Sequence, residues 1–173
     1  FRGFPRHFRS LNDSESDLVN DVRQCNKRQF ERHAHQMQDY YSHYSAGYRT
    51  WTLGHALSGT RPDDTTNTIV MYFWHRANQR TKLWVEKWGR CCCRGGDGTW
   101  RPFSPQASEC SQGLGPENLP QRPMTYSAYS EMCGGSRGRR SEQCRRSYER
   151  YLAEQTQWFD EQNRQMTTQE NTW

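Results

Sequence analysis

The sequence predicts a mainly α-helical chain of about three helices, joined by long irregular connections and held in an extended shape by partners. Three observations predict this fold class. Apolar residues recur at helical spacing in three segments, a glycine- and proline-rich stretch occupies residues 91–138, and aliphatic side chains are scarce. The organisation follows as a basic N-terminal arm (1–13), a helical region of two helices (14–90), an irregular Gly/Pro/Cys segment (91–138) and a C-terminal helix with a tail (139–173).

The first helix is expected from about Ser16 to about Ala46, with Gly47 as its end. Ser14 and Asp17 form a pattern similar to a capping box at its start. After one shift of phase, the apolar positions continue at helical spacing along the whole segment. These positions are Leu18, Val22, Cys25, Phe30, Ala34, Met37, Tyr41, Tyr44 and Tyr48.

The second helix is expected to begin at Asp63, Asp64 or Thr65 and to end at Gly89. Its apolar face is broad and aromatic, so we expect it to pack on something larger than the rest of this chain. Partner contacts are therefore predicted for three of its residues, namely Phe73, Trp84 and Trp88.

The segment 91–138 holds glycines and prolines at a density that excludes long regular elements, and no convincing strand alternation is visible. We expect this segment to lie over a neighbouring protein. A third helix is then predicted from about Ser141 to about Met166. Its inner positions are Cys144, Tyr148, Tyr151, Leu152, Gln155, Phe159 and Met166.

The shortage of aliphatic residues is the reason for expecting stabilisation by partners. Leu, Val, Ile and Phe together number 20 of 173 residues, below the share of roughly 20% at which chains begin to lack a core. Ordering each residue costs about 1–2 kcal/mol, which so few aliphatic groups offset poorly. The 7 Trp and 9 Tyr suit half-wet interfaces. The alternative is a small aromatic-rich domain that folds alone.

The seven cysteines leave one over in any complete set of intrachain disulfides. Three are consecutive, at 91–93, and their diverging side chains do not match the paired spacing of zinc ligands, so ordinary thiols are expected. Disulfides are expected only in an oxidising compartment. Ten residues separate Cys133 from Cys144, which resembles one half of the twin-cysteine helical hairpins of the mitochondrial intermembrane space; the second half is missing, and we assign no family. The other five cysteines are Cys25, Cys91, Cys92, Cys93 and Cys110.

Motifs that would indicate an enzyme lack their context. Residues 134–138 have the form G-x-S-x-G, but no His follows Ser136 and no β-branched strand precedes it. His35 and His43 lie about 12 Å apart along a helix, too far to share one metal ion. The glycine-rich loop 94–98 lacks the lysine of a phosphate-binding loop. We therefore expect no enzyme, and no catalytic, cofactor-binding or metal-binding residues.

The densest basic patch lies near the start of the third predicted helix, followed by two tyrosines. Arginine beside aromatic rings can bind RNA, and an anionic lipid headgroup or an acidic protein would also suit the patch. Glu142, Glu149 and Glu154 are interspersed at helical spacing, which favours carboxylate-paired arginines. Partner contacts are predicted for Arg137, Arg139, Arg140, Arg145 and Arg146.

These features favour a non-catalytic accessory subunit that bridges other subunits of a mitochondrial inner-membrane assembly, such as a respiratory complex or the ATP synthase. The mitochondrial location rests on the chain beginning at Phe1 and on Arg2, Arg6 and Arg9 in an acid-free stretch, as after removal of a presequence. Because no run of 18 apolar residues occurs, we expect a membrane-extrinsic protein. The alternatives are an RNA-contacting mitochondrial ribosomal protein and a secreted disulfide-bonded factor with one free cysteine.

Overall fold

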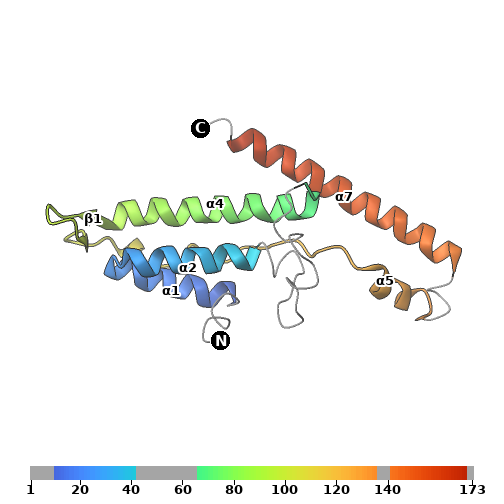
Figure 1. The fold of residues 1–173 in the computed structure, drawn as a ribbon, viewed down its shortest axis with the longest axis horizontal. Coiled ribbons are helices and arrows are strands. Elements are labelled where there is room, and N and C mark those ends of the chain that lie inside the picture. The colour runs from blue at the N-terminus through green and yellow to red at the C-terminus, as the bar shows by residue number, and fades with distance from the viewer. Residues whose placement is uncertain (1–9, 42–65, 136–140, 171–173) are drawn as a thin grey trace.

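The computed structural model describes residues 10–41, 66–135 and 141–170, and it is mainly α-helical, as predicted. Figure 1 shows a long central helix with two shorter helices along one end and a second long helix, the C-terminal one, crossing the other. The described part holds five α-helices rather than about three, together with a short β-hairpin and one 3-10 turn. The elements are α1 (Leu11–Gln24), α2 (Lys27–Asp39), α4 (Thr68–Cys91), β1 (Cys92–Arg94), β2 (Trp100–Pro102), η5 (Ser108–Ser111), α5 (Tyr126–Met132) and α7 (Glu142–Glu170).

The predicted first helix is broken into α1 and α2, which corrects the expectation of one continuous helix. Cys25 has a left-handed backbone conformation (φ 51°) and caps the end of α1, and the side chain of Asn26 then accepts a hydrogen bond from the Gln29 amide to begin α2. The shift of hydrophobic phase marks this break. Helix α1 also begins earlier than predicted, because Ser10 and Asp13 form a reciprocal cap.

Helix α4 is close to the predicted second helix but differs at both ends. Asn67 caps its start by accepting hydrogen bonds from the Ile69 and Val70 amides, whereas the predicted caps at 63–65 lie outside the described residues. Gly89 does not end the helix, which continues to Cys91. The chain then enters β1 directly.

The β1–β2 hairpin was not expected from the sequence. Its strands are antiparallel, with Cys93 opposite Arg101. The Asp97 carboxylate accepts hydrogen bonds from both the amide and the hydroxyl of Thr99, and Gly98 takes a positive φ of 82°. The glycine-rich loop 94–98 is therefore the turn of a hairpin.

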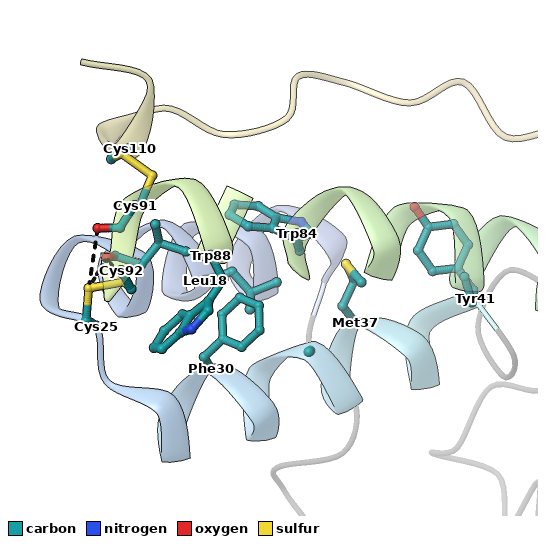
Figure 2. Close-up of a cluster of buried hydrophobic side chains, with 13 residues drawn as sticks. Leu18, Cys25, Phe30, Met37, Tyr41, Trp84, Trp88, Cys91, Cys92 and Cys110 are labelled. Atoms are coloured by element: carbon teal, nitrogen blue, oxygen red, sulfur yellow. Dashed lines mark hydrogen bonds between the residues drawn. A yellow bond between two sulfur atoms is a disulfide. The ribbon is translucent and has the colours of Figure 1, made fainter. Parts of the chain in front are cut away.

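The main core lies between α1, α2 and the C-terminal two thirds of α4 (Figure 2). It is built largely from the positions that helical spacing had marked as the inner face. Aromatic rings take the place of missing aliphatic groups, and Phe30 packs on Trp88 with ring centroids 4.7 Å apart. The buried members of the main core are Leu18, Val22, Cys25, Phe30, Ala34, Met37, Tyr41, Ala77, Trp84, Trp88, Cys91, Cys92 and Cys110.

A smaller cluster joins α4 to α7 at the other end of α4. Tyr72 and Phe73 of α4 pack against Phe159 and Met166 of α7. The backbone carbonyl of Thr68 accepts a 2.9 Å hydrogen bond from the Asn163 side chain, and the Thr68 hydroxyl donates one of 2.8 Å to Asp160. The third predicted helix is confirmed as α7, which extends to residue 170.

A buried ion-pair network holds the extended segment 112–125 against the chain's own helices. Nε and Nη2 of Arg80 donate to the two oxygens of the Glu15 carboxylate, at 2.6 and 2.7 Å, and Nη2 also donates to the Gly115 carbonyl. Glu117 accepts hydrogen bonds from Tyr41 and Arg76. The segment predicted to lie over a neighbour therefore lies, in this part, over α2 and α4.

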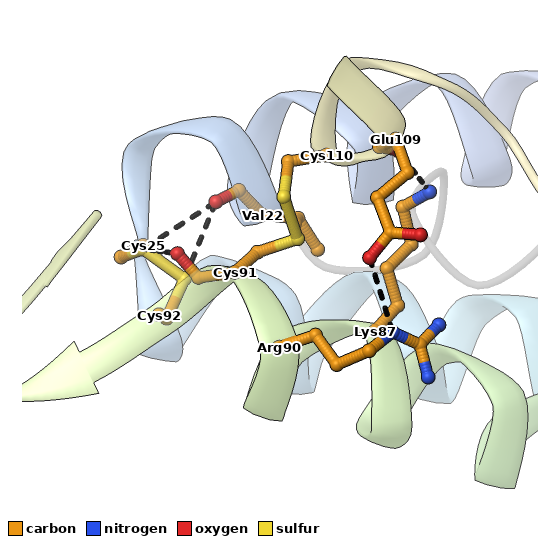
Figure 3. Close-up of a disulfide and its surroundings, with 8 residues drawn as sticks. All are labelled: Val22, Cys25, Lys87, Arg90, Cys91, Cys92, Glu109 and Cys110. Carbon is orange, nitrogen blue, oxygen red and sulfur yellow. Dashed lines mark hydrogen bonds and ion pairs between the residues drawn. A yellow bond between two sulfur atoms is a disulfide. The ribbon is translucent and has the colours of Figure 1, made fainter. Parts of the chain in front are cut away.

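Two disulfides brace the main core where α4 meets β1 (Figure 3). Cys92 bonds Cys25 at the α1–α2 break, and Cys91 bonds Cys110 of η5. Because adjacent side chains diverge, two consecutive cysteines reach opposite partners. This corrects the expectation of ordinary thiols at these positions. Cys93 is the one free cysteine among those described.

The contact between η5 and α4 includes a buried lysine, Lys87. Lys87 is 4% exposed, donates to the Glu109 backbone carbonyl and lies 5.8 Å from the centre of the Trp84 ring. Burial lowers the pKa of Lys87. Arg90 pairs with the Glu109 carboxylate at 3.1 Å. The disulfide Cys91–Cys110 thus lies within a well-packed contact.

Candidate partner-binding surface

The three aromatic residues predicted to contact a partner lie inside the chain. Phe73 and Trp84 are 0% exposed and Trp88 is 7% exposed. The Trp84 indole donates a 3.3 Å hydrogen bond to Glu15, so its polar tip is also engaged within the molecule. Their burial is accounted for by α1, α2 and α7, and the surface open to partners is formed by other residues.

Two arginines of the predicted basic patch are exposed on α7. Arg145 and Arg146 pair with Glu142, at 2.7 and 3.1 Å, as their helical spacing suggested. Hydrogen bonds from Arg145 and then Arg146 hold the pKa of Glu142 below its usual range, and the Glu142 contact raises the pKa of Arg145. The other predicted contacts, Arg137, Arg139 and Arg140, lie outside the described residues.

These arginines belong to a region that we call the arm, residues 122–151, which contains α5 and the first turns of α7. Figure 1 shows it at the opposite end of the molecule from β1. Thr125 caps α5 and Ser141 caps α7. The disulfide Cys133–Cys144 joins the end of α5 to the start of α7, and Cys144 is 4% exposed. The arm is thus a closed helical hairpin.

Four half-buried tyrosines, rather than aliphatic side chains, pack the arm. Tyr129 lies between Tyr148 and Tyr151, with ring centroids 5.4 Å from each, and it stacks on Tyr151 at an interplanar angle of 29°. Tyr126 completes the cluster against Tyr148 at 5.2 Å. Such ring pairs contribute about 0.5–1.5 kcal/mol beyond the burial of their area.

The hydroxyl groups of these tyrosines fix the chain around them. Tyr148 donates a 3.1 Å hydrogen bond to the Met124 carbonyl, and the Tyr151 hydroxyl accepts one of 3.0 Å from the Met124 amide. Tyr129 and Ser147 share a hydrogen bond of 2.9 Å. The segment entering α5 is therefore held on α7 through both the amide and the carbonyl of Met124.

A shallow hollow of about 500 Å³ lies on α7 within the arm. It is bordered by two rows of side chains four residues apart, which face the same way on a helix. Among the described residues, none pairs with the Arg150 guanidinium. The hollow is lined by Glu142, Gln143, Arg146, Ser147 and Arg150.

The arm presents hydrogen-bond donors, tyrosine edges and an exposed thioether on one rigid hairpin. Met132 is 72% exposed. Tyrosine, methionine and arginine are enriched where proteins bind one another. The sequence prediction missed Tyr126, Tyr129 and Arg150. The matching i, i+3 spacing of Tyr126 with Tyr129 and of Tyr148 with Tyr151, on either side of two cysteines, was the available signal.

Elsewhere in the described residues, a second open cavity of about 570 Å³ lies between the start of α4 and the end of α7. Across it, Thr68 bonds Asp160 through its hydroxyl and Asn163 through its backbone carbonyl. No group of three or more described His, Cys, Asp or Glu residues is arranged to hold a metal ion. None of the described helices has an apolar stretch long enough to cross a bilayer.

Comparisons with protein-family models, curated proteins and solved structures found no match to this chain.

Proposed function

We propose that this chain is a non-catalytic structural subunit of a larger protein assembly, working in an oxidising compartment. The observation that carries this proposal is the set of three disulfides, which brace both ends of the molecule. Proteins of reducing compartments seldom keep such bonds. The main core is closed around its own aromatic residues, whereas the arm presents a rigid surface suited to a partner.

The assembly we favour remains a mitochondrial inner-membrane energy-converting complex, with the chain on its membrane-extrinsic surface bridging neighbouring subunits. Support for the mitochondrial location comes from the acid-free, arginine-containing stretch of residues 1–12. The disulfides favour the intermembrane-space side over the reducing matrix.

A secreted disulfide-bonded protein is the second candidate, because three disulfides with one free cysteine is the pattern expected for that class. The RNA-contacting ribosomal protein has less support. The tyrosine rings beside Arg145 and Arg146 are packed on one another rather than open for the stacking of bases.

The test is to isolate the chain from its native cells without reductant and to size it under native conditions. We expect it in a large protein particle, at fixed stoichiometry with other subunits, before and after ribonuclease treatment. Release by ribonuclease would indicate the ribosomal alternative, and recovery as a free protein from the medium would indicate the secreted one. Recovery as a free intracellular monomer would contradict all three.

A further inference from the structure

We propose that the arm binds an acidic segment of a partner protein, with a partner carboxylate seated in the hollow beside Arg146 and Arg150. This inference rests on the proposed function, since it names the chemistry of the partner that the subunit would join.

The positive charge of the sequence is concentrated in residues 122–151. Residues 122–151 contain seven arginines and three glutamates, without Lys or Asp, which gives a net charge of +4 in a chain of net charge +5. The remaining residues are therefore nearly neutral in sum. A stretch of sequence with this excess of positive charge attracts an oppositely charged partner.

The hollow on α7 offers hydrogen-bond donors to a carboxylate. Both oxygens of Glu142 are engaged, Oε1 with Arg146 and Oε2 with Arg145, so this carboxylate does not compete strongly for the remaining donors. Gln143, Ser147 and Arg150, which pairs with no other described residue, supply hydrogen-bond donors on adjacent turns. A planar guanidinium matches a carboxylate with two parallel hydrogen bonds.

The packing of the tyrosine rings favours an acidic protein over a nucleic acid as the partner. Bases stack on open aromatic faces, but the rings of Tyr129, Tyr148 and Tyr151 are packed on one another and are only half exposed. Arginine and tyrosine with an exposed Met132 fit a protein interface instead.

The experiment measures binding of fluorescein-labelled hexaglutamate peptide to the oxidised full chain by fluorescence anisotropy. We expect saturable, salt-sensitive binding that weakens by about tenfold or more in the double variant Arg146→Gln/Arg150→Gln. Arg146→Lys/Arg150→Lys keeps the charge but loses the guanidinium fork, so we expect it to bind at an intermediate level.

Arg164→Gln is the matched control. Arg164 lies on the same helix, is 70% exposed against 72% for Arg146 and also pairs with a nearby glutamate. It should leave peptide binding within about twofold of the wild type, as expected for a charge remote from the hollow. Equal binding by the wild type and the double glutamine variant would overturn the inference. Tighter binding of oligouridine or of phosphatidylglycerol vesicles than of hexaglutamate would also overturn it, in favour of RNA or membrane.

The native particle separates this inference from the proposed function. Retention of the Arg146→Gln/Arg150→Gln variant in the particle at the wild-type level would overturn the inference while the structural role stands. Absence of the wild-type chain from any particle would overturn the proposed function itself.

Discussion

The main core and the arm are both closed by disulfides, yet they differ in what the disulfide surrounds. In the main core, Cys25–Cys92 and Cys91–Cys110 belong to a cluster of buried aromatic and aliphatic side chains. In the arm, Cys133–Cys144 closes a thin hairpin of half-buried tyrosines whose charges face water. A chain poor in aliphatic residues thus builds a dry core at one end and a charged, solvent-exposed surface at the other.

Removing the Cys25–Cys92 disulfide of the main core should have the largest effect on stability. Cys25–Cys92 closes a sequence separation of 67 residues, against 11 for Cys133–Cys144. In the chain-entropy description these bonds contribute roughly 4 and just under 3 kcal/mol. We expect Cys25→Ser/Cys92→Ser to lower the free energy of unfolding of the whole chain, measured by urea denaturation without reductant.

Cys133→Ser/Cys144→Ser is the comparison variant. It should lose hydrogen-exchange protection mainly in α5 and the first turns of α7, while the main core keeps its protection. Equal loss of protection in both regions would show that the two ends unfold as one unit and would remove the contrast between them.

The buried ion pair gives the next largest effect. Arg80 and Glu15 have side chains 8% and 13% exposed, and removing one partner of such a pair typically costs about 3–5 kcal/mol. We expect Arg80→Met to destabilise the protein by about 3 kcal/mol in thermal unfolding. Lys27→Met, which breaks the exposed pair with Glu31 (54% and 62% exposed), should change stability by less than about 0.5 kcal/mol.

The tyrosine hydroxyls of the arm should each contribute less. Tyr151→Phe removes the acceptor for the Met124 amide, and a hydrogen bond of this kind contributes about 1 kcal/mol. Faster exchange of the Met124 amide, with unchanged exchange in α4, is the expected result. Tyr40→Phe serves as the control outside the arm, and an identical exchange pattern in both variants would argue against the local role of Tyr151.

The smallest effect is a difference in pH dependence. Burial raises the pKa of Asp21 above 3.8, although the His33 contact, at 2.6 Å, acts in the opposite direction. Its contribution to folding is therefore full below pH 3.8 and is lost as the pH rises through the raised value. Asp21→Asn removes this titration, so its stability relative to the wild type should increase with pH across that window.

The pH dependence of stability that Glu142 contributes has the opposite sign. Arg145 and Arg146 lower its pKa below 4.5, so its contribution is present above pH 4.5 and is lost as the pH falls through the lowered value. Thermal melts across pH of Asp21→Asn and Glu142→Gln, each compared with the wild type, measure both effects. Parallel curves for the two variants would contradict the contrast between buried and exposed charges.

Much of the fold could be predicted from helical spacing alone. The inner positions marked on the first two predicted helices, such as Leu18, Met37 and Trp84, are buried, because a 3.6-residue period fixes which side chains share a face. Burial of Phe73, Trp84 and Trp88 was predicted too, but against partners. Sequence spacing shows that a face is apolar without showing what covers it.

The remaining features depend on contacts between distant residues. The pairing of Cys25 with Cys92, the network around Arg80 and the docking of Glu117 on Tyr41 join segments that no local pattern relates. The sequence marked the arm by its arginines, by Tyr148 and Tyr151 and by the spacing of Cys133 and Cys144, but it left the pairing of these cysteines open. The tyrosine cluster depends on the packing of α5 against α7, which brings two short i, i+3 pairs together.

We infer that the disulfides supply the stability that this chain's few aliphatic residues do not. The most direct test is to denature the natively purified protein without reductant, alkylate its free thiols and count the modified cysteines by mass spectrometry. We predict one alkylated cysteine, Cys93, with Cys25, Cys92, Cys91, Cys110, Cys133 and Cys144 protected in three bonds. Alkylation of all seven cysteines before reduction would contradict it.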